Sequence, residues 1–357
     1  MNDRTLQAQL DVAGRAAVVF GGGGSALKHI AALTRHGALV TVVSQEVGAS
    51  ISDLAARGLV VWHRREFDEK DLDDTWLAVA ATEDRDTDAA ISRAAEAQRI
   101  WCLADPATQQ SGPRSSSGGR VILVGGGPGD PGLLTAAGME ALRIADVVVT
   151  DRLAPLSLLA GLDPDVEVID VGKVPCGKAT KQSEINRMLI DAARAGKTVV
   201  RLKGGDSFLF GRGGEEIQAC FAAGVEASVI PGVSSALAVP ALAGIPVTHR
   251  GLVQGVTVVS GHVPPGHSAC TIDYSALVRS GTTLVFLMAV ATLPDITRSL
   301  LGHGLSAETP AATIANGTTS AQRVVRGTLA DIADIVTTEG IVPPAVTVIG
   351  AVAALED

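Results

Sequence analysis

The stretch RLKGGDSFLFGRGGEE, at residues 201–216, constrains the fold more than any other part of the chain. It follows an apolar run that predicts the end of a buried strand. Its closing Glu215 and Glu216 suit the first turn of a helix, because carboxylates are stabilised at helix N-termini. Glycines, which carry no Cβ, let a backbone approach a ligand closely. The pattern therefore predicts an α/β fold with a ligand-binding loop between strand and helix. The alternative is a connecting loop that needs glycine only to turn.

A second glycine-rich loop, near the N-terminus, favours a dinucleotide-type fold. Gly21, Gly23 and Ala26 satisfy the spacing G-x-G-x-x-G/A. The segments around it expected to form a strand, a helix and a second strand are Ala16–Phe20, Ser25–His36 and Leu39–Val43. This context predicts a Rossmann-like βαβ unit. The alternative is that a run of glycines matches the spacing by chance.

A segment rich in Ser and Gly separates this region from the remainder of the chain. Residues 107–119 have the composition of a flexible linker. We therefore expect a Rossmann-like domain at 1–106, a linker at 107–119 and a second domain at 120–357. The second domain alternates short apolar runs with helical segments, which predicts further α/β structure.

Charge and composition exclude several classes of function. The formal net charge of −9 argues against a nucleic-acid partner. The cysteines match no metal-binding spacing, and they stand at Cys102, Cys176, Cys220 and Cys270. We expect free thiols in a reducing cytoplasm and no metal site. No uninterrupted apolar run reaches membrane-spanning length, so we expect a soluble cytoplasmic protein without a membrane partner.

Several motifs carry a resemblance to known families. Residues 120–357 contain, in this order, VGGGPGDPGLLT, VVVTDRLA, RLKGGDSFLFGRGGEE, VIPGVSSA, GIPVTHR, LVFLMA and ANGTT. This region resembles the uroporphyrinogen-III C-methyltransferases of the tetrapyrrole methylase family. Residues 15–105 resemble, with fewer motifs, the precorrin-2 dehydrogenase domain that is fused to this methylase in sirohaem synthases. GRAAVVFGGGGSALKH, WLAVAATEDRD and RIWCLADPA carry that second likeness.

The resemblance implies a fold, a cofactor and an assembly. It implies a methylase of two α/β lobes, at about 120–232 and 233–357, with S-adenosylmethionine in the cleft between them, and a homodimer. The implied cofactor-binding positions are Pro128, Gly204, Gly205, Asp206, Leu209, Ser234, Ser235, Met288 and Gly317. Ser207 and Ser234 stand where relatives usually have Pro and Thr, and both changes are small.

The implied reaction moves methyl groups from S-adenosylmethionine to the electron-rich pyrroles of uroporphyrinogen III and gives precorrin-2. By resemblance, Asp151 is the candidate proton acceptor and Lys173 the candidate proton donor. Each ends a predicted strand, where open α/β sheets place functional groups. The alternative for Asp151 is a helix N-cap. The alternative for Lys173 is a surface lysine or a contact to a substrate carboxylate.

The substrate carries several carboxylates, so an acidic protein needs a local basic surface to bind it. Arginine can bind a carboxylate through two parallel hydrogen bonds. The candidates, each adjoining a motif, are Arg152, Arg201, Arg212 and Arg250. The alternative for each is a structural ion pair.

The N-terminal region departs from its relatives. Cys102 and Asp88 stand where asparagines are usual. Asp105 aligns with the acidic residue that serves the dehydrogenase, but the helical segment that normally follows is replaced by the linker. The positions for NAD, interpreted as remnants, fall on Gly24, Ser25, Gln45 and Glu46. We expect weak NAD binding and no oxidation of precorrin-2.

The leading hypothesis is an S-adenosylmethionine-dependent uroporphyrinogen-III C-methyltransferase in sirohaem or cobalamin biosynthesis. One alternative is a bifunctional sirohaem synthase that also oxidises precorrin-2 with NAD. The others are a methylase of a later corrin intermediate and a tetrapyrrole-binding protein without activity.

Overall fold

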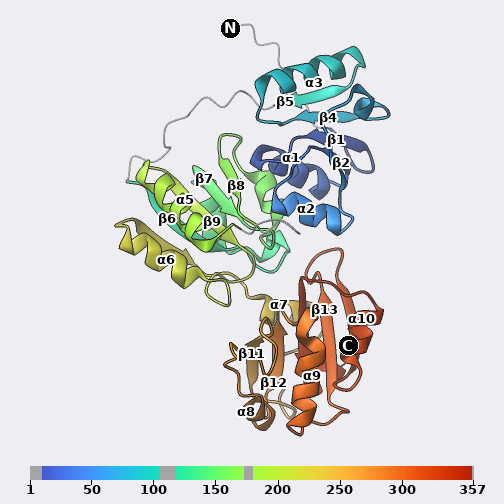
Figure 1. Ribbon diagram of the computed structural model, residues 1–357, viewed down its shortest axis with the longest axis vertical. Coiled ribbons are helices and arrows are strands. Elements are labelled where there is room, and N and C mark those ends of the chain that lie inside the picture. Colours follow the sequence, from blue (N-terminus) through green and yellow to red (C-terminus); the bar gives the residue numbers. More distant parts are fainter. Residues whose placement is uncertain (1–9, 105–117, 173–179, 356–357) are drawn as a thin grey trace. The chain divides into compact units, whose positions relative to one another are not determined.

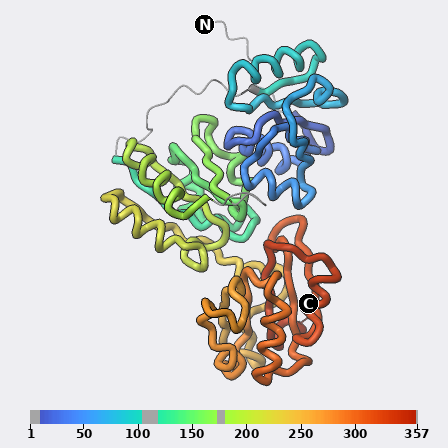
Figure 2. The backbone as a smooth tube through the Cα atoms, in the orientation of Figure 1, coloured from blue at the N-terminus to red at the C-terminus, as the bar shows by residue number. Residues whose placement is uncertain are grey.

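The computed structural model describes residues 10–104, 118–172 and 180–355. Within them the chain forms three five-stranded sheets, each flanked by helices. The sheets follow one another along the sequence and can be traced by colour, from blue through green to orange and red (Figure 1; Figure 2). The prediction of an α/β protein with an N-terminal Rossmann-like domain is confirmed.

The first sheet is parallel and has the strand order β3-β2-β1-β4-β5. Its strands are β1 (Ala16–Phe20), β2 (Leu39–Val43), β3 (Val61–His63), β4 (Leu77–Ala80) and β5 (Trp101–Ala104). Its helices are α1 (Gly24–Arg35), α2 (Ala49–Ala56), η1 (Glu69–Leu72) and α3 (Arg85–Ala97). Phe20, Leu72 and Ile91 form part of a closed core between α3 and the sheet.

The second sheet has the strand order β10-β6-β9-β7-β8. Its strands are β6 (Arg120–Gly125), β7 (Val147–Thr150), β8 (Glu167–Asp170), β9 (Thr198–Lys203) and β10 (Glu226–Ile230). Its helices are η2 (Pro131–Leu133), α4 (Ala136–Arg143), η3 (Leu156–Gly161), α5 (Gln182–Arg194) and α6 (Gly213–Ala222). Leu189 of α5 and Cys220 of α6 pack on alternate strand residues such as Val147 and Val149, so these helices cover one face.

The third sheet is mixed, with the order β11-β12-β15-β13-β14. Its strands are β11 (Val256–Ser260), β12 (Thr283–Leu287), β13 (Pro310–Ala315), β14 (Arg323–Thr328) and β15 (Ala345–Ile349). Its helices are α7 (Ser235–Leu242), α8 (Tyr274–Arg279), η4 (Val290–Thr292), α9 (Leu293–Gly302), α10 (Ile332–Thr338) and η5 (Ala351–Ala354). Phe286 faces the core under α9 and α10, whereas its neighbour Val285 faces the core under α7, as the two-residue period of a strand requires.

The chain divides into two compact units that do not follow the sequence order. The first comprises residues 1–123, 139–202 and 214–229, and the second comprises residues 124–138, 203–213 and 230–357. The loops after β6, β9 and β10 therefore belong with the C-terminal sheet. In the ranges that the structure describes, no helix combines the length and apolar character that crossing a bilayer requires.

Candidate active site

Three loops of the second unit meet backbone to backbone. Gly125 ends β6, Gly205 follows β9 and Gly232 follows β10. A Cβ on Gly232 would overlap the carbonyl oxygen of Gly205 and lie 2.6 Å from the Cα of Gly125. Gly205 also has a φ of +64°, which favours glycine, and it exchanges two backbone hydrogen bonds of 2.6 and 3.2 Å with Gly127. We call Gly125, Gly127, Gly205 and Gly232 the glycine junction.

The side chain of Asp206 connects two of these loops through hydrogen bonds. One oxygen of its carboxylate accepts hydrogen bonds from the amides of Phe208 (2.9 Å) and Leu209 (3.2 Å). The other oxygen accepts from the amide of Gly232 at 3.0 Å. The carboxylate thus holds the loop after β9 against the loop after β10.

The expected serine positions lie at the start of α7. Ser234 is the N-cap, and its hydroxyl oxygen accepts from the amide of Ala236 at 3.2 Å. The hydroxyl oxygen of Ser235 lies 3.3 Å from where a Cβ of Gly205 would stand. The glycine junction therefore borders the N-terminus of α7, where amide donors point outward.

The loop after β13 reaches the same region. The Thr318 hydroxyl oxygen accepts from the amide of Asp130 at 3.0 Å, beside Pro128 in the loop after β6. Gly317 packs so closely on α7 that an added Cβ would lie 2.7 Å from a methyl carbon of Val239. The structure thus brings together the loops that carry Pro128, Gly204 to Leu209, Ser234, Ser235 and Gly317.

Backbone strain is concentrated in these segments. Of eight described non-glycine residues with a positive φ, five belong to the second unit, namely Phe210, Arg212, Met288, Asn316 and Thr318. Such conformations are uncommon outside glycine and cluster at functional sites. Sequence reasoning singled out Met288 and Arg212 but missed Phe210, Asn316 and Thr318. Only Asn316 carried a local signal, because asparagine tolerates this region.

The residues present fit S-adenosylmethionine. The glycine junction packs three loop backbones against one another, since a Cβ on Gly125 or Gly232 would meet the backbone of a neighbouring loop. Backbone amides and carbonyls of these loops are thereby gathered in one place, where the cofactor can meet them. Among the described residues, the buried Asn316 side-chain oxygen and Ser207 hydroxyl have no hydrogen-bond partner, and such atoms call for an explanation. Met288 is 48% exposed at the end of β12 and offers an apolar contact for adenosine.

Asp151 belongs to a polar network in the first unit. It follows β7, and its carboxylate pairs with the guanidinium of Arg201 at 3.0 Å and accepts from the amide of Leu153 at 3.1 Å. Arg201 also pairs with the fully buried Glu216 at 3.1 Å and donates to the carbonyls of Val149 and Leu202. The Asp151 side chain keeps 24% of its surface exposed, so it can still meet a substrate. Lys173 lies outside the described residues.

The four arginine candidates differ in their surroundings. Arg201 is only 3% exposed, and its guanidinium donates to groups of the protein itself. These contacts favour a structural ion pair over a substrate contact for this residue. Arg152 pairs with Asp53 at 2.7 Å and keeps a third of its side chain exposed. Arg212 and Arg250 are exposed, and Arg212 also has an interaction partner.

The NAD positions lie in a crowded setting. A Cβ on Gly24 would overlap the carbonyl oxygen of Val168. The side chain of Gln45 donates to Glu66 at 2.9 Å, and Gln45 and Glu46 border an open hollow of about 530 Å³. Asp88, one of the departures from the family, accepts from the amide of Thr82 at 3.0 Å. Asp105 lies outside the described residues.

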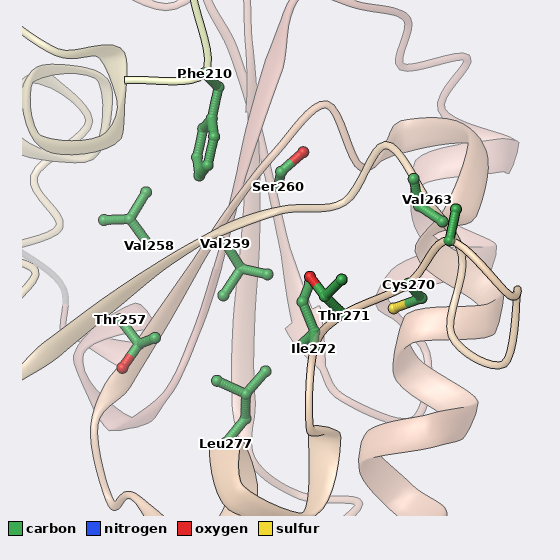
Figure 3. A pocket seen from close by; sticks show the side chains of 11 residues that line it. Phe210, Thr257, Val258, Val259, Ser260, Val263, Cys270, Thr271, Ile272 and Leu277 are labelled. Atoms are coloured by element: carbon green, nitrogen blue, oxygen red, sulfur yellow. The ribbon is translucent and has the colours of Figure 1, made fainter. Parts of the chain in front are cut away.

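A separate hollow of about 370 Å³ lies beside the edge strand β11. Figure 3 shows Phe210 extending toward Val258 and Ser260 of that strand, with Cys270 and Ile272 on the opposite wall. The hollow contains none of the expected cofactor positions, although Phe210 directly follows Leu209. Its lining is mostly apolar and carries no charged side chain.

Comparison with known proteins agrees with the geometry. The sequence matches the family "Tetrapyrrole (Corrin/Porphyrin) Methylases" over residues 120–333 and the family "Putative NAD(P)-binding" over residues 8–110. It is 44% identical to the S-adenosyl-L-methionine-dependent uroporphyrinogen III methyltransferase of Methanosarcina barkeri over 68% of this chain and 95% of that protein. It is also 44% identical to a sirohaem synthase of Pseudomonas putida over 74% of this chain and 55% of that protein, so it spans about half of that relative.

A solved structure supports the same assignment. The uroporphyrin-III C-methyl transferase of Thermus thermophilus, crystallised in complex with S-adenyl homocysteine, superposes with a TM-score of 0.55 and 40% identity, covering 66% of this chain and 98% of that one. The fold, the glycine junction and these matches lead to one conclusion: the chain belongs to the tetrapyrrole methylase family.

Proposed function

We propose that the protein is an S-adenosylmethionine-dependent uroporphyrinogen-III C-methyltransferase that makes precorrin-2. The observation that carries the proposal is the glycine junction, where the backbones of three loops leave no room for a Cβ. It lies within the region matched to the methylase family. The names of the relatives and the ligand of the Thermus structure support the same substrate and cofactor.

The cofactor supplies an activated methyl group on a sulfonium, so positioning accounts for most of the catalysis. We propose that the junction and the N-terminus of α7 bind the polar parts of the cofactor, through backbone groups near Gly204, Gly205, Ser234 and Ser235. Asp206 keeps the two loops together. Met288 and Gly317 complete the proposed site, and Pro128 and Leu209 flank it.

Proton movement around the macrocycle is the part left to side chains. We propose Asp151 as the acceptor, because its carboxylate is partly exposed and held by Arg201. Its bond from the Leu153 amide closes a local turn. The alternative of a helix N-cap finds no support, because the next helix, η3, has Pro155 at its N-cap. Lys173, which follows β8 in the chain, is the proposed donor.

We propose that Arg152, Arg212 and Arg250 contact substrate carboxylates, whereas Arg201 is structural. The proposal rests on exposure, since Arg201 is buried and the other three reach the surface. Arg201 would first have to lose its fully buried partner Glu216, which is costly, whereas an exposed guanidinium can bind a carboxylate directly.

The decisive experiment is anaerobic incubation with uroporphyrinogen III and S-adenosylmethionine, with and without NAD, followed by absorption spectra and mass. We expect two methyl groups to be added, independently of NAD. Calorimetry of the full chain with S-adenosylhomocysteine should show saturable binding. A folded protein that neither binds this product nor methylates the substrate contradicts the proposal.

The alternative of a bifunctional sirohaem synthase is favoured by one observation, the match of residues 8–110 to a family described as putative NAD(P)-binding. Against it stands the crowding at Gly24. Inclusion of NAD in the incubation above separates the two functions, because only the bifunctional enzyme would form NADH.

We also propose a homodimer in the cytoplasm. The dimer is what the resemblance to the family implies, and Leu237 and Leu242 of α7, which are 49% and 55% exposed, are apolar side chains that a second copy would remove from water. The described cysteines are free thiols, and burial raises the pKa of Cys102 and Cys220. They therefore suit a reducing compartment. Sedimentation of the purified protein tests the dimer, and cell fractionation tests the location.

A further inference from the structure

Helix α2 of the N-terminal domain is buried on nearly every side. The six residues from Ala49 to Leu54 are each at most 9% exposed. A helix on one face of a sheet normally leaves a polar face in water, so α2 needs a second cover. That cover includes the end of β8 and Gly172, which belong to the same compact unit.

Asp170, the last residue of β8, makes the closest polar contact. One carboxylate oxygen accepts from the amide of Ser50, in the first turn of α2, at 2.8 Å. The other accepts from the amide of Gly172 at 2.9 Å. A carboxylate is stabilised at a helix N-terminus, so this side chain links the N-terminal domain to the segment that precedes Lys173.

Gly172 brings a second strand end to the same place. A Cβ on Gly172 would stand 2.8 Å from the Cβ of Ala49 and 3.2 Å from the amide nitrogen of Arg152. The small side chains of α2 thus let the segments after β7 and β8 approach it together. These are the segments that carry Asp151 and lead to Lys173.

Asp53 completes the contact. Its carboxylate is buried and pairs with Arg152 at 2.7 Å, while its other oxygen lies 3.4 Å from Arg57 of its own helix. Arg152 directly follows Asp151, whose carboxylate is held by Arg201. The segment after β7 is therefore held by two ion pairs, one with Asp53 of the N-terminal domain and one with Arg201 of β9.

Helix α1 also contacts the segment that precedes β8. The Lys28 ammonium group donates to the carbonyls of Pro164 (3.0 Å) and Val166 (3.1 Å), just before β8. An ammonium group shared by two carbonyls fixes the approach of α1 to this segment.

We propose that the N-terminal domain positions the substrate-facing strand ends of the methylase, with Asp53 as the positioning residue for Arg152. The proposal rests on the proposed function, because it assigns Arg152 to the substrate. It gives the Rossmann-like domain a role that needs no dinucleotide. Loss of the Asp53 charge releases the Arg152 side chain and weakens substrate binding, while the glycine junction is left intact.

The test is the full-length variant Asp53→Asn, with Arg57→Gln as the matched control. Asp53→Asn keeps the side-chain shape but replaces a charge-assisted bond by a neutral one, which predicts a rise of about five- to tenfold in KM for uroporphyrinogen III. The affinity for S-adenosylhomocysteine and kcat should change less than about twofold. Arg57→Gln removes only the longer contact of Asp53 and should behave as the wild type.

Hydrogen exchange supplies a readout that does not depend on activity. Peptides that cover 151–154 and 168–172 should exchange faster in Asp53→Asn than in Arg57→Gln. If Asp53→Asn fails to fold, a second variant, Lys28→Met, removes the α1 contacts at a half-buried position and should accelerate exchange in the 164–172 peptide. Unchanged exchange in both variants overturns the proposal, whether or not the protein methylates uroporphyrinogen III. Changed exchange without any wild-type methylation upholds the docking and rejects the proposed function instead.

Discussion

Asp151 is the residue on which the proposed proton transfer depends most. Asp151→Asn keeps the bond to the Leu153 amide and most of the contact to Arg201 but removes the basic carboxylate. General acid–base groups contribute about a hundredfold or more, so we expect kcat to fall by roughly that factor while S-adenosylhomocysteine affinity is kept. Lys173→Met should have the same signature. Steady-state kinetics with calorimetry check both.

Glu140→Gln is the matched control for this pair. Glu140 forms an exposed ion pair with Arg143 on α4, and exposed pairs contribute little to stability. This variant should turn over like the wild type. If Asp151→Asn and Lys173→Met also stay within about threefold of wild-type kcat, far less than an acid–base role implies, both residues are structural.

The glycine junction predicts a sharp contrast between two glycines. A Cβ at Gly232 would overlap the Gly205 carbonyl, whereas a Cβ at Gly214 of α6 would meet nothing within 4 Å. Gly232→Ala forces two loops apart, which costs about 1–3 kcal/mol, and it should abolish measurable S-adenosylhomocysteine binding. Gly214→Ala should preserve binding and should not destabilise the fold, because alanine is the better helix former. Calorimetry and thermal unfolding test both variants. If the two variants bind S-adenosylhomocysteine equally well, the glycine junction is not part of the cofactor site.

At the scale of single residues, sequence reasoning succeeded where chemistry is local. The glycines around Asp206 were chosen because the loop lacks Cβ atoms, and the structure shows those backbones meeting. It could not identify Thr318, whose hydroxyl meets the amide of Asp130 far away in the sequence. Nor could it decide whether Arg201 pairs with substrate or with Glu216, since the two residues meet only once β9 and α6 have packed.

At the scale of elements, strands with β-branched residues were predicted best. The strands β1 and β2 have the predicted bounds. Helix α2 was missed because a helix buried on nearly every side has no clear apolar stripe to recognise. Strand β14 was missed because it is a sheet edge whose exposed arginines and valines give no clear alternation.

Helix α8 allows a test of burial through the chain's one tyrosine. The Tyr274 side chain is buried under the C-terminal sheet, its hydroxyl has no partner among the described residues, and burial raises its pKa to about 12. The folded form therefore prefers the neutral phenol. The resulting stability is complete below the unfolded pKa near 10 and is lost as the pH rises toward 12.

Tyr274→Phe should remove this loss. Because an unpaired buried hydroxyl costs about 1–3 kcal/mol, the variant should be at least as stable as the wild type at pH 7 and less sensitive to pH above 10. Denaturant unfolding between pH 8 and 11.5 compares the two proteins, and near-ultraviolet absorbance follows the phenol directly. A tyrosine that titrates near its ordinary pKa in the folded protein contradicts the burial argument.

At the scale of the whole molecule, composition and motifs identified two fold types but not how their parts combine. Residues 124–138 and 203–213 precede the whole C-terminal sheet in sequence yet belong to its compact unit. Such long-range contacts leave no local pattern. The docking of α2 against the end of β8 is of the same kind, since Asp53 and Arg152 lie far apart in the chain and neither belongs to a recognisable pair motif.

That docking bears on whether the N-terminal domain can use NAD. A pyrophosphate binds at a helix N-terminus through free amide donors and a positive dipole. Here a Cβ on Gly23 would stand 2.9 Å from the carboxyl carbon of Glu83, and the Val168 carbonyl lies against Gly24. The Asp170 carboxylate already accepts from the first turn of α2. The protein's own acceptors therefore surround the loop where the dinucleotide's anionic group would enter.

We therefore expect no oxidation of precorrin-2 and only weak NAD binding by the full chain. Hydride transfer requires the nicotinamide and the substrate carbon within about 3–3.5 Å, and a loop blocked by like charge cannot hold the cofactor for it. The measurement is anaerobic incubation of enzymatically made precorrin-2 with excess NAD, followed by NADH absorbance, with a bifunctional sirohaem synthase as the positive control. NADH that forms together with sirohydrochlorin, and that disappears in Asp105→Ala, would establish a second activity and require the contacts of Gly24 and Asp170 to open during turnover.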